Sequence, residues 1–173
     1  EGILSQLGQG NLTLLRRVIE TNHQGNPSTA IKYISSHDET WVNHGGMSPT
    51  KRLGGAGNEF VRMKIRLAWA VMACTLGTPM MFMGIELMND RGWDNDTGYG
   101  DLAWEPAAGD HGANFQLMIE HINELRNKHK ALHGANIDQM LVHQDHDNGI
   151  LAYKRWDSRG GVFLIIINIS DNQ

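Results

Sequence analysis

Apolar residues recur at helical spacing in three segments of the chain, residues 12–20, 58–77 and 114–130, and this spacing predicts three amphipathic helices. Two short apolar runs, residues 31–34 and 80–83, lie on either side of the second segment and predict buried strands. Two strands joined by a helix form a right-handed crossover unit with parallel strands, so this part of the chain is predicted to be α/β. The expected inner faces are Val61, Ile65, Ala68, Trp69 and Met72 in the second helix, and Phe115, Met118, Ile119, Ile122 and Leu125 in the third.

The pattern changes after Gly134. Three strand-like runs follow, at residues 137–143, 150–156 and 162–169, with turn-forming residues between them. Consecutive strands joined by short turns form an antiparallel meander, so a domain boundary is expected near Gly134. The expected domains are residues 1–133 and residues 134–173.

Titratable side chains follow both predicted strands of the α/β part. His37, Asp38 and Glu39 come after the first strand, and Glu86 comes after the second. In parallel α/β folds the loops at the C-terminal ends of strands carry the reactive groups. A carboxylate among apolar walls or other carboxylates can acquire the displaced pKa that acid–base and charge-stabilising chemistry requires. The sequence therefore predicts a site at this edge. The alternative is that the His-Asp pair caps a helix or holds a loop.

Composition and charge narrow the classes of function. With 40% hydrophobic and 20% charged residues, the 173-residue chain has the composition of a globular protein. A formal net charge of -4 provides no broad cationic surface for a nucleic-acid partner. No stretch approaches the roughly 20 apolar residues of a membrane span. Cys74 is the single cysteine, which excludes an internal disulfide framework and is typical of a reducing compartment such as the cytoplasm.

Two groups of side chains could be metal ligands. His and Asp residues cluster at residues 143–147, but they lie across a predicted hairpin turn, where Asp and Asn are expected for backbone reasons. Asp94, Asp96 and Glu105 match positions 1, 3 and 12 of a calcium loop, but Tyr99 stands where position 6 requires glycine. We favour the turn in the first case and expect neither a metal site nor an organic cofactor.

Longer motifs point to a known family. The segment YISSHDE, a Gly-rich loop and then FVRMKIRLAWAVMACTLGTPMMFMGIEL resemble the last part of the catalytic barrel of the α-amylase clan of glycoside hydrolases. Within the clan they are most similar to 1,4-α-glucan branching enzymes. The later segments LAWEP, LMIEHINELRNKHKAL and NGILAYKRW extend the resemblance over nearly the whole chain from Ala30. The chain departs from the family at GIELM, where GNEFG is usual, and in the long insert at residues 89–101.

The resemblance implies a fold and a set of site residues. Residues 1–133 would be the C-terminal part of a (β/α)8 barrel, about strands seven and eight with their helices, and residues 134–173 the start of an antiparallel all-β domain. Asp38 matches the third catalytic carboxylate of the clan, which stabilises an oxocarbenium-like transition state. His37 matches a histidine that hydrogen-bonds the same sugar ring. The remaining expected substrate-binding residues are Glu39, in an acceptor or loop-holding role, Glu86, with structural hydrogen bonding as the alternative, and Trp93 and Tyr99, which could stack on sugars or merely pin a loop.

The implied reaction cleaves an α-1,4 glucosidic bond and transfers the glycosyl chain to a 6-hydroxyl of an α-glucan. A retaining enzyme needs a nucleophilic carboxylate and a separate acid/base about 5 Å apart, and the segments that carry them in this clan do not occur here. Because the chain begins with Glu1 and ends soon after its last strand, we expect a piece of a longer protein that is inactive by itself and has the rest of the parent chain as a partner. The alternatives are a hydrolase or debranching relative of the clan, and a non-catalytic glucan-binding module.

Overall fold

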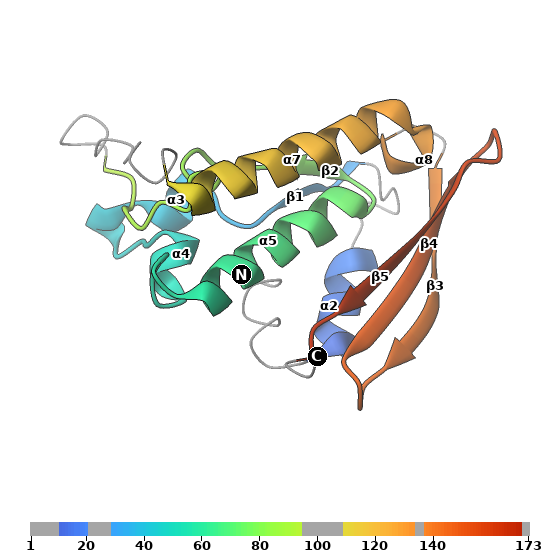
Figure 1. Cartoon of the computed structure of the whole chain (residues 1–173), viewed down its shortest axis with the longest axis horizontal. Coiled ribbons are helices and arrows are strands. Elements are labelled where there is room, and N and C mark those ends of the chain that lie inside the picture. The colour runs from blue at the N-terminus through green and yellow to red at the C-terminus, as the bar shows by residue number, and fades with distance from the viewer. Residues whose placement is uncertain (1–10, 21–28, 95–108, 134–136, 171–173) are drawn as a thin grey trace. The chain divides into compact units, whose positions relative to one another are not determined.

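The computed structural model describes residues 11–20, 29–94, 109–133 and 137–170 of the chain (Figure 1). The chain divides into two compact units, each assembled from segments that are distant in sequence. Helices α5 (Glu59–Cys74) and α7 (Asp110–Lys128) contribute residues to both units. The domain boundary expected near Gly134 stays a prediction. The first unit comprises residues 1–32, 70–79 and 122–173, and the second comprises residues 33–69 and 80–121.

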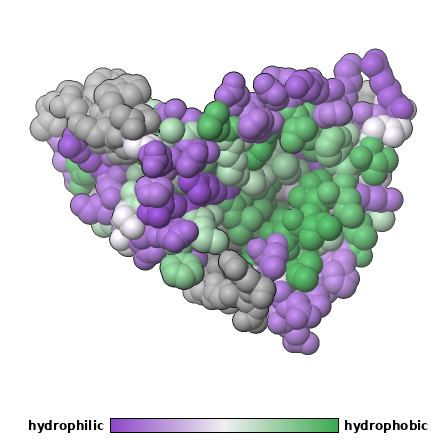
Figure 2. Space-filling model, in the orientation of Figure 1, coloured by the Kyte–Doolittle hydropathy of each residue, from purple (hydrophilic) through white to green (hydrophobic). Residues whose placement is uncertain are grey.

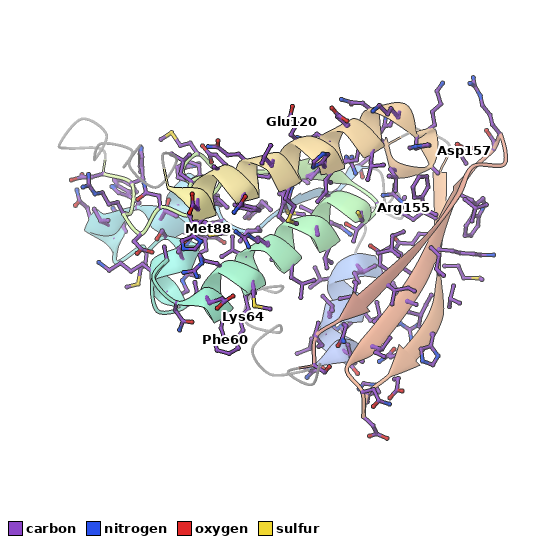
Figure 3. All side chains as sticks on the ribbon, viewed as in Figure 1. Phe60, Lys64, Met88, Glu120, Arg155 and Asp157 are labelled. Carbon is purple, nitrogen blue, oxygen red and sulfur yellow. The ribbon has the colours of Figure 1, made fainter. Side chains whose placement is uncertain are left out.

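The first unit contains the antiparallel sheet that the sequence predicts. Its strands are β3 (Ile137–Asp145), β4 (Ile150–Asp157) and β5 (Val162–Asn168), paired in the order β3-β4-β5. Gly149, with φ 65°, lies in the first turn, where a left-handed backbone favours glycine. In the second turn the carboxylate of Asp157 accepts hydrogen bonds from two backbone N–H groups (Figure 3). The predicted meander is therefore confirmed, with β3 extending to Asp145.

The two faces of this sheet differ in burial. Leu151, Tyr153 and Arg155 alternate along β4 and are at most 1% exposed, as the period of two in a strand requires. Apolar side chains also gather on the surface of the sheet (Figure 2). The exposed apolar residues of its outer strands are Met140, Val142, Val162, Leu164 and Ile166.

Strands β1 (Ile31–Tyr33) and β2 (Thr78–Met80) form a second, two-stranded sheet and are connected through α5. The prediction of a strand at residues 80–83 is wrong, because pairing begins and ends earlier. Gly77, with φ 110°, brings the chain so close to Ala30 that a Cβ would lie 2.5 Å from the Ala30 carbonyl oxygen. The N–H of Thr78 then donates to that oxygen at 2.8 Å.

The helices follow the predicted periodicity at their centres and differ at their ends. Helix α2 (Leu12–Glu20) is confirmed. Helix α7 begins at Asp110, earlier than the expected residue 114, with an acidic residue in its first turn, where the helix dipole favours negative charge. It is followed by α8 (Lys130–His133). Within the part of the chain that the structure describes, no helix combines the length and apolarity needed to cross a membrane.

The expected inner faces are confirmed for α5 and only partly for α7. All five predicted inner residues of α5 are buried, whereas in α7 Phe115 is buried and Leu125 is 46% exposed. The prediction for Leu125 is wrong because periodicity defines the face of a helix, but not whether another element covers that face along its whole length. The residues between these extremes, Met118, Ile119 and Ile122, are half-buried.

Buried cations of the first unit bind the C-terminal carbonyls of two helices. Arg155 is fully buried on β4 (Figure 3), and its Nη1 donates to the carbonyls of Cys74 and Thr75 at 2.9 and 2.8 Å. Lys32 is 8% exposed, and its Nζ donates to the carbonyls of Val18 and Ile19 at 3.0 and 2.8 Å. Carbonyls at a helix C-terminus have no partner within the helix, and the helix dipole there favours positive charge. These contacts tie β1 to α2 and the sheet to α5.

The lowered pKa of buried Lys32 predicts how the free energy of unfolding depends on pH. Burial, and then the charge of Arg155, lower the pKa of Lys32 from 10.5 to about 8, which corresponds to about 3 kcal/mol. Between pH 8 and 10.5 the unfolded chain holds the lysine proton and the folded chain releases it, so the free energy of unfolding gains a contribution that rises with pH. Below pH 8 both states are protonated, and the cost of the buried charge is fully present.

We therefore expect urea unfolding from pH 7 to 10 to show a difference between the wild-type chain and Lys32→Met. The wild type should gain up to about 3 kcal/mol relative to the variant across this range. Burial raises the pKa of the Cys74 thiol and of the Tyr153 hydroxyl, which acts in the opposite direction but equally in both proteins. Two curves that stay parallel would contradict the prediction.

Candidate active site

The residues that the sequence singles out after the first strand form a one-turn helix, α3 (His37–Thr40), in the second unit. Ser36, with φ -129° and ψ 177°, is its N-cap in extended conformation. The Glu39 carboxylate accepts a hydrogen bond from the Ser36 N–H at 2.9 Å, which is the reciprocal contact of a capping box. Glu39 therefore caps the start of a helix, whereas the sequence predicts an acceptor or loop-holding role for it. Its acceptor role stays a prediction.

The side chains of His37 and Asp38 take no part in the capping box and face solvent. Their side chains are 62% and 76% exposed, and His37 Nε2 lies 3.2 Å from Asp38 Oδ1. A contact between two such exposed groups contributes little to stability because water screens it. Among the described residues no apolar walls enclose Asp38, contrary to the setting that the sequence suggests for a strand-end carboxylate. The reason is that α3 lies at the surface of its unit, so both groups are accessible to a ligand.

Trp93 joins this pair through its backbone and its ring. Its N–H donates to the Thr40 carbonyl and its carbonyl accepts from the Val42 N–H, both at 2.9 Å. Its ring meets that of His37 edge to face, with centroids 6.1 Å apart and planes at 83°. The structure therefore brings Trp93 next to His37 and Asp38 of α3, although the two segments are distant in sequence.

Two further aromatic residues belong to this cluster and are missed by the sequence reasoning. The Trp41 and Trp93 ring centroids are 5.7 Å apart, and those of Trp41 and His44 are 4.0 Å apart. No periodic signal in the sequence marks them, because α3 ends before Trp41, whose φ of -68° and ψ of 106° are extended. His44 lies in the following 3-10 turn η2 (Val42–His44).

The Gly-rich segment that follows is ordered by short elements. Helix α4 (Pro49–Arg52) begins with proline, and the Ser48 hydroxyl before it accepts from the Lys51 N–H at 3.2 Å, a favoured start for a helix. Further on, both carboxylate oxygens of Asp90 lie 3.1 Å from the Ala56 nitrogen. The loop of residues 42–57 is therefore tied to the segment that carries Trp93.

The other predicted site residues have mixed outcomes. Glu86 is half-buried in a turn, and its carboxylate accepts from the Gly84 N–H at 2.8 Å, which is the structural alternative. A glucan contact for Glu86 stays a prediction. Tyr99 lies outside the described residues, as do Asp96 and Glu105 of the calcium template. Asp94, the first residue of that template, accepts from the Asn43 side chain at 3.2 Å.

The His and Asp cluster at residues 143–147 belongs to the hairpin between β3 and β4. The Asp145 carboxylate accepts from the N–H groups of Asp147 and Asn148, both at 3.0 Å, and from the Asn148 side-chain amide at 2.8 Å. These bonds, first among them that from the Asn148 side chain, lower the pKa of Asp145. The interpretation of this cluster as a turn is confirmed.

The sequence of this chain matches curated proteins but no protein-family model. Over 144 residues, 79% of the chain, it is 31% identical to the 1,4-alpha-glucan branching enzyme GlgB of Bradyrhizobium sp. (strain ORS 278). The resemblance to the 1,4-alpha-glucan branching enzymes is confirmed. The branching enzyme of Pseudomonas syringae pv. tomato is 29% identical over 140 residues, 78% of the chain. The matches cover 19% and 18% of these two branching enzymes, so the chain spans about a fifth of the curated relatives it matches.

Solved structures of α-amylase-family enzymes share the fold. A debranching enzyme of Nostoc punctiforme, soaked with acarbose, gives a TM-score of 0.60 at 13% identity over 92% of this chain and 28% of its own. A pullulanase of Paenibacillus barengoltzii, in complex with maltohexaose and α-cyclodextrin, gives 0.64 at 18% identity over 91% of this chain and 27% of its own. At such identities the likeness shows the fold alone, that of part of an α-amylase-family (β/α)8-barrel enzyme. The assignment to barrel strands seven and eight stays a prediction.

Proposed function

We propose that this chain is part of a 1,4-α-glucan branching enzyme and supplies one wall of its active site. The enzyme would cleave an α-1,4 bond of a glycogen-like or starch-like glucan and transfer the released chain to a 6-hydroxyl. The grouping of His37, Asp38 and Trp93 on the surface of the second unit carries the proposal. Its support is the similarity to branching enzymes over more than three quarters of the chain.

Asp38 is the residue with a role in the chemical step. As the glycosidic bond breaks, the sugar ring acquires positive charge, and an ionised carboxylate beside it stabilises the transition state more than the neutral ground state. The Asp38 side chain is 76% exposed, and its Oδ1 lies 3.2 Å from His37 Nε2. Its oxygens can therefore accept hydrogen bonds from sugar hydroxyls. The nucleophile and the acid/base are assigned to a part of the natural protein outside this chain.

His37 and Trp93 bind the same substrate in this proposal. An imidazole can donate to or accept from sugar hydroxyls, and the indole of Trp93 offers an apolar face that is partly exposed. The edge-to-face contact between the two rings sets their mutual angle at 83°. Tyr99, Glu86 and the acceptor role of Glu39 complete the proposed set of substrate contacts.

Two other functions predict different products. A hydrolase or debranching enzyme of the same clan would use the same third carboxylate, and the fold similarity to a debranching enzyme and a pullulanase is compatible with it. A non-catalytic module would bind glucan through exposed aromatic rings and would not need Asp38. Because all three use an α-glucan, binding alone does not separate them.

Product analysis separates them. We expect the protein, as its gene encodes it, to convert amylose into a glucan with new α-1,6 linkages, detected by NMR, with no matching increase in reducing ends. An increase in reducing ends without new linkages would replace branching by hydrolysis. Binding of amylose without any change in linkage would leave only the module.

A further inference from the structure

Helix α3 lies between two loops that approach its last turn through glycines. A Cβ on Gly92 would lie 2.4 Å from Val42 Cγ1 and 2.7 Å from the Thr40 carbonyl oxygen. A Cβ on Gly46 would lie 2.5 Å from the Trp41 nitrogen. Neither glycine has a φ in the left-handed region, so the close approach of one backbone to another is the reason that a side chain does not fit there.

Backbone hydrogen bonds connect both loops to this turn. Besides the two bonds of Trp93, the N–H of Gly46 donates to the Trp41 carbonyl at 2.8 Å, and the N–H of Met47 donates to the Glu39 carbonyl at 3.0 Å. Within α3 itself, the Thr40 N–H donates to the Ser36 carbonyl at 3.3 Å. A helix of one turn is unstable without tertiary contacts, because nucleating it fixes several dihedral angles for one hydrogen bond. The position of α3 therefore depends on the two loops.

We propose that Gly92 is a positioning residue, which allows the segment at Trp93 to close on α3 and hold His37 and Asp38 in place for glucan. This inference rests on the function proposed for Asp38. In this inference Gly92 does not touch the substrate, and it acts through the backbone of residues 40–42. A methyl group at Gly92 would have to move by about 0.7 Å from the Thr40 carbonyl oxygen to reach ordinary contact, which begins at 3.4 Å. A misplacement of about 1 Å can lower a rate about 10²-fold.

The first test compares Gly92→Ala with Gly57→Ala in the protein as its gene encodes it. Gly57 is a matched control, because it lies in the same unit and a Cβ there would have nothing within 4 Å. We expect Gly92→Ala to lower kcat for glucan transfer about 10²-fold with a smaller change in KM, and Gly57→Ala to lower neither. Equal kcat in the two variants overturns the inference.

The second test asks whether Gly92 acts through Asp38. If it does, Gly92→Ala should cost little further activity in a protein that already carries Asp38→Asn, because residues of one network are not additive. Losses that multiply would overturn the inference. Should Gly92→Ala not fold, Gly46→Ala serves in its place, because a Cβ there would lie 2.5 Å from the Trp41 nitrogen and would displace the same turn without removing a proposed substrate contact. Its loss should also vanish in the Asp38→Asn background.

The outcomes separate this inference from the proposed function. If Asp38→Asn lowers glucan transfer about 10²- to 10³-fold and Gly92→Ala keeps it at the wild-type level, only the positioning role of Gly92 fails. If Asp38→Asn keeps full activity, the proposed function of Asp38 fails whatever Gly92→Ala does.

Discussion

Replacing Asp38 by asparagine is expected to lower the turnover number of glucan transfer about 10²- to 10³-fold, the usual effect of removing one electrostatic contact to a transition state. Asparagine has nearly the shape of aspartate, but it has no charge to offset the positive charge that develops on the sugar ring. Because this charge exists only in the transition state, kcat should fall more than KM rises. The measurement is steady-state transfer on amylose with the protein as its gene encodes it.

Stability should not account for this loss. The Asp38 side chain is 76% exposed and contacts only the exposed His37 among the described ion pairs, so the free energy of unfolding should change by less than about 0.5 kcal/mol. Glu120→Gln is the matched control, since Glu120 is an exposed carboxylate on α7 of the same unit (Figure 3). Full turnover of Asp38→Asn would remove Asp38 from the mechanism.

Replacing Arg155 by alanine is expected to be the most damaging change to the stability of the first unit, by about 3–5 kcal/mol. The substitution leaves a cavity where a fully buried side chain stood, and it removes the donor for the Cys74 and Thr75 carbonyls at the end of α5. Urea unfolding of the chain measures the loss.

Arg155→Met separates the two causes. Burial lowers the pKa of Arg155 from 12.5 to about 10, so the folded state disfavours the charge, and a methionine fills the space without it. We expect Arg155→Met to retain about half or more of the stability that Arg155→Ala loses. Arg159→Ala, at an exposed residue in the turn between β4 and β5, should change stability by less than about 0.5 kcal/mol. If methionine were as damaging as alanine, the carbonyl contacts would dominate and filling the cavity would not matter.

Local pattern was sufficient for most helices and strands of this protein. The limits of α2, the buried face of α5 and the three-stranded meander follow from apolar spacing and turn residues, because these signals act between residues close in sequence. His37, Asp38 and Glu39 likewise follow a short apolar run in the sequence. The place of the candidate site is therefore indicated by local pattern.

Contacts between segments distant in sequence determine where the second strand begins and which part of α7 is covered. The second strand begins at Thr78 because the backbone at Gly77 passes within reach of Ala30, and nothing near residue 80 in the sequence indicates this. Leu125 is exposed although its spacing is that of an inner face.

The candidate site shows the same division. The sequence by itself determined which residues carry charge and aromatic rings, and that they follow strands. Only the tertiary structure placed Trp93 against α3, made Glu39 a capping residue and left Asp38 exposed. The physical reason is that backbone hydrogen bonds between loops, and the close approaches that glycines permit, depend on distances that no spacing along the chain encodes.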